Sequence, residues 1–241
     1  MSEGQYSSAG FSALRQFAKR DRTVEKCELC SLAIRPDHPH LIELLQRKLV
    51  CACDACALLF SGPSKKYRRV PRRIQAFPNF HLSDAEWNAL MVPINMVFFF
   101  KNSVENRVEN RVVAMYPSPA GATESLLELE SWNDIVAHNP SLQEMEPDVE
   151  ALLVNRLGYS RGYSVPEYYQ VPIDECYKLV GLIRANWNGL SGGAEVWQKI
   201  GEFFRNMKDR AVIVGSESVG AEAGAELPAE QTITFEEESH A

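Results

Sequence analysis

The chain has 241 residues, of which 45% are apolar and 24% are charged. These values are ordinary for a globular protein and exclude a fibrous or fully disordered chain. A membrane-spanning helix needs about 20 consecutive apolar residues, and no apolar run in the sequence is close to this length. The first residues, MSEGQYSSAG, lack a basic start followed by an apolar stretch. We therefore expect neither a membrane span nor a secretory signal, and we predict a cytoplasmic protein.

The net charge of −7 conceals a basic front part and an acidic end. Residues 1–73 carry 14 Lys and Arg against 7 Asp and Glu, whereas residues 216–241 carry 7 acidic and no basic side chains. The acidic end has few large apolar groups to bury, so it is predicted to be a disordered tail. At the other end, apolar residues at helical spacing favour a short helix over residues 9–19, within an N-terminal segment of residues 1–26.

Five of the six cysteines lie close together, in the pattern Cys27-x2-Cys30 followed by Cys51-x-Cys53-x2-Cys56. Disulfides are rare in the reducing compartment that we expect. Two C-x2-C pairs are typical of a tetrahedral zinc site, because thiolates three positions apart on a tight turn converge on one ion at about 2.3 Å. We predict a Zn²⁺ ion bound by Cys27, Cys30, Cys53 and Cys56.

Three further residues could take part in this site. Cys51 lies two positions before Cys53 and so shares a strand face with it, which allows it to replace Cys53 as a ligand. His38 and His40 lie between the two pairs, and imidazole is a common zinc ligand. Four thiolates already complete a tetrahedron, so we expect both histidines outside the coordination sphere, while a Cys3His site stays open.

The order of elements around the cysteines suggests a small zinc fold. The sequence KLVCA (48–52) is predicted to be a strand, and residues 57–60 continue from Cys56 as a short helix. This order resembles a treble-clef zinc finger, with a zinc ribbon as the alternative. A nuclease centre of the HNH type is not expected, because residues 57–60, on the helix directly after Cys56, include no His or Asn. A rubredoxin-like iron site is a further alternative, although neither pair carries the usual Gly and Pro.

A basic segment follows the cysteines. Residues 61–73 contain no acidic residue. Because prolines within this segment disfavour a long helix, we predict an extended basic strap. Such a strap can neutralise phosphates or bind an acidic protein surface, including the acidic half of this chain. We therefore predict partner binding by its six basic residues, Lys65, Lys66, Arg68, Arg69, Arg72 and Arg73.

Residues 74–215 are predicted to form a mixed domain, beginning with a helix and a strand pair. Ser83 and Glu86 form a capping-box pattern that opens a helix through about Met91. Residues 94–100 and 111–116 are predicted to be paired strands, joined by a loop with a duplicated VENR. Two prolines and a glycine in Pro117–Gly121 then predict a rigid turn, where Gly121 could also let the backbone approach a ligand.

The second half of this domain is predicted to be mainly helical. We expect helices over 131–138 and from Pro147 through 155, then a strand over 167–171. Two long apolar stripes follow, separated by the breaker NGLSGG (188–193), and predict a helical hairpin against the sheet. The predicted fold class is α+β: a treble-clef or ribbon-like zinc module with a basic strap (27–73), then a mixed α+β domain with a C-terminal helical hairpin (74–215).

Catalytic groups are not evident in the sequence. His81 and His138 are far apart along the chain, each beside a helix end, where capping roles are common. Cys176 lies on the apolar stripe of a predicted helix, which favours a small core residue over a nucleophile. No nucleophile and base can be argued to lie together, so we do not expect an enzyme.

Several distinctive motifs are spread along the chain: CELC, HPHL, LVCACDACALLF, YRRVP, YPSPAGATESLL and VPIDECYKLVG. Together they resemble an uncharacterised bacterial family, some of whose members are encoded beside [NiFe] hydrogenase structural subunits. The likeness runs from about Phe11 to Phe204. The resemblance implies a cytoplasmic accessory protein for hydrogenase assembly or operation. It also implies that the five clustered cysteines and His40 belong to one site.

Three functional hypotheses follow. The first is a non-enzymatic zinc protein that binds a protein partner, such as a hydrogenase subunit. The second is a nucleic-acid-binding regulator that uses the zinc module and residues 65–73. The third is an electron carrier, or a metal-transfer protein that acts through the spare Cys51.

Overall fold

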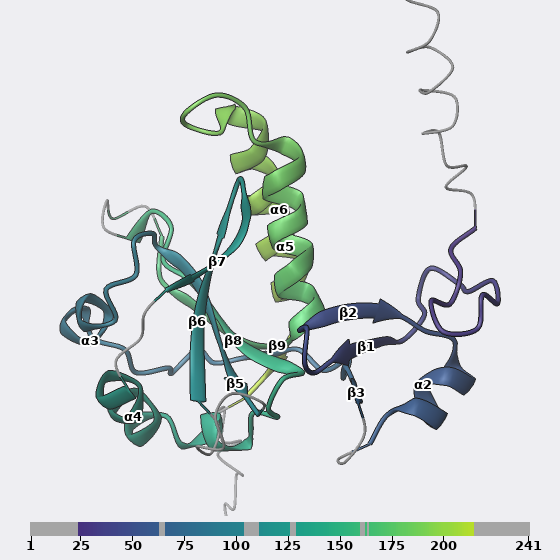
Figure 1. Ribbon diagram of the computed structural model, residues 1–241. Helices are drawn as coiled ribbons and strands as arrows, with labels where there is room; N and C mark the ends of the chain where they lie inside the picture. Colours follow the sequence, from purple (N-terminus) through teal and green to yellow (C-terminus); the bar gives the residue numbers. More distant parts are fainter. Residues whose placement is uncertain are drawn as a thin grey trace, which may run out of the picture.

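The computed structural model describes residues 24–62, 66–103, 111–125, 129–159, 162 and 164–214. The predicted N-terminal helix, the acidic tail and most of the VENR repeat lie outside these ranges. The described chain forms two sheets with helices around them (Figure 1), which confirms the mixed α+β class. Among the described residues, no helix is both long and apolar enough to cross a bilayer.

The smaller sheet carries the cysteine-rich part of the chain. Its strand order is β2-β1-β3, and both pairings are antiparallel. The predicted strand at KLVCA and the predicted helix after Cys56 are both present in this region. The elements are β1 (His40–Glu43), β2 (Lys48–Cys51), α2 (Asp54–Phe60) and β3 (Tyr67–Arg69).

The larger sheet has seven strands in the order β10-β4-β9-β8-β5-β6-β7. Neighbouring strands of this sheet are antiparallel, with the exception of the short parallel pair β10 and β4. The strands are β4 (Gln75–Ala76), β5 (Met96–Asn102), β6 (Arg111–Ser118), β7 (Gly121–Ser125), β8 (Glu150–Asn155), β9 (Glu167–Pro172) and β10 (Val212–Ile213).

Helices cover both faces of the larger sheet (Figure 1). The predicted C-terminal hairpin of α5 and α6 packs on one face, and α3 and α4 pack on the other. The capping box at Ser83 is present, since Ser83 Oγ accepts from the Glu86 N–H and the Glu86 side chain accepts from the Ser83 N–H. The elements are α3 (Asp84–Ala89), α4 (Leu129–His138), the 3-10 helix η1 (Pro140–Glu144), α5 (Ile173–Asn186) and α6 (Gly193–Arg210).

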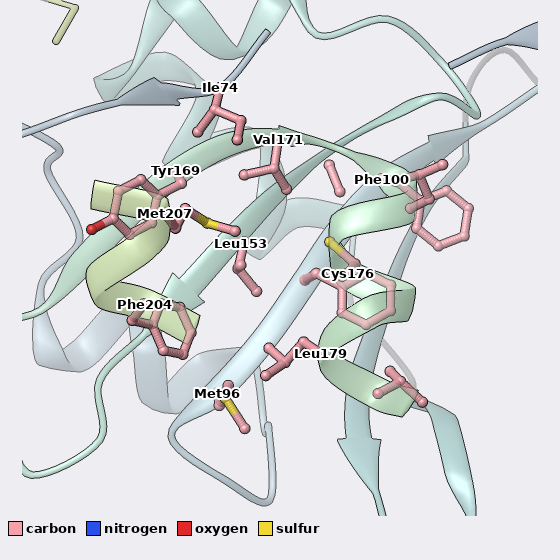
Figure 2. Packing of buried hydrophobic residues seen from close by; sticks show 14 of the residues in the cluster. Ile74, Met96, Phe100, Leu153, Tyr169, Val171, Cys176, Leu179, Phe204 and Met207 are labelled. Atoms are coloured by element: carbon pink, nitrogen blue, oxygen red, sulfur yellow. The ribbon is translucent and has the colours of Figure 1, made fainter. Parts of the chain in front are cut away.

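Alternation along the central strands builds two hydrophobic cores. In β5, Phe98 and Phe100 face α5 and α6, whereas Val97 and Phe99 face α3 and α4. Figure 2 shows the first core, where side chains from the sheet interlock with α5 and α6. Cys176 is fully buried there, as predicted for a core residue. Each large side chain buried in this way stabilises the fold by about 1.5–3 kcal/mol.

The helix predicted to begin at Pro147 is wrong, because residues 150–155 form strand β8 in the middle of the larger sheet. Ala151 and Leu153 face one core, and Leu152 and Val154 face the other. A strand that is buried on both faces has a continuous run of apolar residues. The spacing of apolar residues therefore cannot distinguish such a strand from a buried helix.

The turn predicted at Pro117–Gly121 contains fewer residues than expected. β6 continues through Pro117 to Ser118, and β7 begins at Gly121, so only two residues form the hairpin turn. Gly121 has φ 132°, a conformation that favours glycine. Ser118 Oγ donates to the Gly121 carbonyl over 2.9 Å. The hairpin turn therefore accounts for the glycine at position 121.

The two sheets are joined by strand β1 and by the basic strap. Leu41 of β1 is buried beside the cysteines, whereas its neighbour Ile42 packs into the core of the larger sheet. In the strap, Arg73 forms two hydrogen bonds, of 2.5 and 2.9 Å, with the fully buried Glu150. Arg68 lies 3.3 Å from the buried Asp148. The strap therefore binds the acidic half of its own chain.

We predict that Arg73→Ala lowers the free energy of unfolding by about 2–3 kcal/mol, because it leaves the Glu150 carboxylate buried without its cation. The double variant Arg73→Ala/Glu150→Gln should recover at least about 1 kcal/mol of this loss. Urea denaturation followed by circular dichroism measures both effects.

Arg69 provides the matched control, since it lies in the same strap but is exposed. Arg69→Ala should change stability by less than about 0.5 kcal/mol. An equal loss from Arg69→Ala and Arg73→Ala would contradict the role of the buried pair.

Candidate metal centre

The first C-x2-C pair lies on a tight reversal of the chain. The Cys27 N–H donates to the Leu32 carbonyl and the Ser31 N–H donates to the Cys27 carbonyl, each over 2.8 Å. Ser31 has φ 63°, the left-handed conformation that closes such a turn. The reversal directs both thiols of the pair toward the second pair.

The second pair lies at the start of α2. Cys53 is the N-cap residue of this helix, and its Sγ accepts a hydrogen bond of 3.4 Å from the Cys56 N–H. Cys56 follows in the first turn of the helix. The Cys53 sulfur therefore caps α2 by accepting from one of the first N–H groups of the helix.

The four sulfurs of Cys27, Cys30, Cys53 and Cys56 lie within 4.8 Å of one another. The Sγ atoms of Cys30 and Cys53 are 3.7 Å apart. Sulfurs at the corners of a tetrahedron around zinc lie about 3.8 Å apart, as bonds of about 2.3 Å require. All four are free thiols. The cluster can therefore hold a metal ion.

These cysteines form much of the hydrophobic core of the small sheet. Among the described residues, Cys27, Cys53 and Cys56 are buried with two larger side chains, Leu41 and Val50, and the partly buried Leu29, Ile34 and Tyr67 pack against them. A core of this size gives little free energy against the entropy of folding. An ion that binds the four thiols would therefore add substantially to the stability of the small sheet.

The thiols of the cluster differ in acidity. Burial raises the pKa of Cys27, but hydrogen bonds from the backbone of Cys53, Leu29 and Cys30 outweigh this and lower the pKa to about 6. Burial and hydrogen bonds with Cys53 and Cys30 raise the pKa of Cys56 to about 12. Without a cation, therefore, Cys56 keeps its proton at neutral pH while Cys27 loses its own.

Cys51 and the two histidines lie together in a group of their own. Cys51 Sγ and one ring nitrogen each of His38 and His40 lie within 4.8 Å of one another, separate from the group of four sulfurs. This differs from the expectation that Cys51 and His40 share one site with the four cysteines. The reason is that β1 and β2 place His40 opposite Cys51, two residues before Cys53 turns into α2.

A third group brings together residues that the sequence left separate. The rings of His81 and His138 lie 4.8 Å apart, and both contact the Glu86 carboxylate. The two histidines are exposed. No local pattern could have shown this proximity, because it depends on the packing of α3 against α4.

The six basic residues predicted to bind a partner have different surroundings. Arg68 and Arg73 pair with buried acids, as described above. Lys66 lies 3.5 Å from the buried Glu43. Arg72 donates to the Asp37 carbonyl, and both Arg69 and Arg72 line a cavity of about 450 Å³ beside Cys53. Lys65 lies outside the described residues.

The sequence profile of one protein family matches residues 26–211. The chain belongs to the DUF5947 family. This is a family of unknown function, and no curated protein and no solved structure is similar to the chain. The matched residues of this DUF5947 protein include the four clustered cysteines, the neighbouring group of His38, His40 and Cys51, and the helical hairpin of α5 and α6.

We predict that Cys30→Ser removes one equivalent of bound metal and makes residues 24–62 sensitive to protease, because the small core then lacks the ion that stabilises it. Metal analysis and limited proteolysis of the purified chain measure the two effects.

Cys176→Ala is the control, since it removes a cysteine from the other core and should leave the metal content unchanged. If Cys30→Ser keeps its metal and its resistance to protease, the cluster is not a structural metal site.

Proposed function

We propose that this DUF5947 protein is a non-enzymatic zinc protein whose cysteine module binds a protein partner. The convergence of four sulfurs carries the first part of the proposal. A site in which four thiolates fill the tetrahedron leaves no open position for substrate, as in structural zinc sites. Zinc is favoured over iron because neither C-x2-C turn has the glycine and proline typical of rubredoxin loops.

The chain order around the cysteines supports a treble clef. A knuckle with Cys27 and Cys30 precedes the β1–β2 hairpin, and Cys53 and Cys56 open helix α2. The same order of knuckle, hairpin and helix defines that zinc-finger type. In such a fold the ion fixes the helix on the hairpin, so the outer face of α2 becomes a rigid surface.

The outer face of α2 is apolar, which supports binding to a protein. Leu58, Leu59 and Phe60 are exposed at its end, and the exposed fraction of Leu58 is 73%. Adjacent exposed apolar side chains are characteristic of interaction surfaces. Figure 1 shows that α2 lies on the side of the small sheet away from α5 and α6, where a partner could approach it.

The charge pattern disfavours nucleic acid as the partner. Arg68 and Arg73, two of the six basic residues of the strap, pair with Asp148 and Glu150 of the same chain. These cations are therefore not available to neutralise phosphates. A hydrogenase subunit, as the family resemblance implies, is our proposed protein partner.

We predict that Leu58→Glu lowers recovery of the partner at least about tenfold, because a charge at the centre of an apolar contact costs more than 1.4 kcal/mol. The tagged full chain is used to isolate partners from its native cells, and mass spectrometry quantifies hydrogenase subunits.

Leu190→Glu is the matched control, since Leu190 is fully exposed at the distant turn between α5 and α6. Recovery that falls equally for both variants, or for neither, argues against α2 as the docking surface. Recovery of other proteins through α2 would retain the surface and reject the hydrogenase.

A further inference from the structure

The group of His38, His40 and Cys51 has the composition of a metal site with an open position. It offers two imidazoles and one thiolate, a donor set that suits zinc and other divalent ions of intermediate softness. The three potential ligand atoms lie within 4.8 Å of one another. The two imidazole rings meet edge to face, with their centroids 4.8 Å apart.

His38 has a buried nitrogen without a partner. Its side chain is only 6% exposed, and Nδ1 lies 2.7 Å from the Arg35 carbonyl, to which it donates. Nε2 has no hydrogen-bond partner within the described part of the chain. Leaving a buried polar atom unpaired costs about 1–3 kcal/mol. The hydrogen bond at Nδ1 leaves Nε2 with its lone pair free to bind a cation.

His40 is oriented in the same way by a residue from the other sheet. Its Nδ1 lies 2.7 Å from Oδ2 of Asp174, in the first turn of α5. A carboxylate that accepts from one ring nitrogen while the other binds metal is the usual support of a zinc-bound histidine. The second oxygen, Asp174 Oδ1, is buried and has no partner among the described residues.

Access to the group comes through a neighbouring cavity. A cavity of about 410 Å³ is lined by His38, His40 and Asp174, and by charged side chains of both signs, the acidic Asp37 and Glu175 and the basic Arg72, Lys178 and Arg210. An ion and its water can therefore reach the imidazoles from solvent.

We propose that this protein binds a second zinc ion, held by Nε2 of His38, Nε2 of His40 and Sγ of Cys51, with water in the fourth position. Asp174 orients His40, and its free Oδ1 accepts a hydrogen bond from the zinc-bound water. The site is distinct from the group of four sulfurs and is independent of the proposed partner binding.

The decisive variant removes both proposed Nε2 ligand atoms and keeps a hydrogen-bond donor at each Nδ1 position. In His38→Asn/His40→Asn, the amide nitrogen of each Asn can still donate where Nδ1 donated, to the Arg35 carbonyl and to Asp174. The purified full chain, saturated with Zn²⁺ and dialysed, should hold two equivalents of zinc, and the double variant should hold one.

A matched control uses the other histidine pair. His81→Asn/His138→Asn removes two imidazoles that also lie 4.8 Å apart and should leave two equivalents bound. Asp174→Asn should weaken the second zinc by about 10–100-fold, while the first zinc keeps its affinity.

X-ray absorption of the zinc-loaded wild-type chain tests the ligands without a variant. Two sites of the proposed composition together contain five sulfur ligands and two imidazole ligands. A spectrum that shows every zinc surrounded by four sulfurs and no imidazole would reject the second site. One zinc in the wild-type chain, or two in the His38→Asn/His40→Asn variant, would also overturn the proposal. Loss of both ions in that variant would mean a single merged site, which contradicts it as well.

Discussion

The closeness of four cysteine sulfurs is the constraint on which the small sheet depends. Two unit charges 4 Å apart repel by about 4 kcal/mol at an effective dielectric constant of 20. Four thiolates within 4.8 Å are therefore incompatible with a stable fold unless protons or a cation compensate them. The opposite pKa shifts of Cys27 and Cys56 are the response of a cluster compensated by protons alone. A divalent ion removes that conflict and adds bonds from the ion to each sulfur.

Strand β1 transmits this constraint to the rest of the molecule. Its alternating side chains belong to different cores, since Leu41 packs with the cysteines and Ile42 with the larger sheet. At its start, His40 bonds to Asp174 in α5. One short strand thus connects both groups of potential metal ligands to the helical hairpin through directly contacting residues.

Local chemistry made part of this structure predictable. The C-x2-C pairs, the capping box at Ser83 and the stripes of α5 and α6 are each defined by residues a few positions apart. Their spacing fixes which side chains share a face, independent of distant elements. The cysteine cluster and the helical hairpin could therefore be predicted from the sequence.

Contacts between distant segments could not be predicted in this way. His40 and Asp174 are 134 positions apart, and Arg73 and Glu150 are 77 apart. Burial on both faces hid the strand character of β8, because it removed the polar positions that reveal a period of two. The basic composition of the strap could not show which of its arginines pair with buried acidic side chains.

The contacts around the small sheet supply the physical argument for the binding role that we propose. One side is fixed to the larger sheet by Ile42 and by the arginines of the strap, and the sulfur cluster fixes α2 on the other side. The end of α2 carries the exposed apolar side chains of Leu58 and Phe60. A rigid, apolar helix end loses little conformational entropy when a partner covers it, so its exposed area converts efficiently into affinity. Rigid support on both sides of an exposed apolar surface is therefore the physical argument for the docking role that we propose.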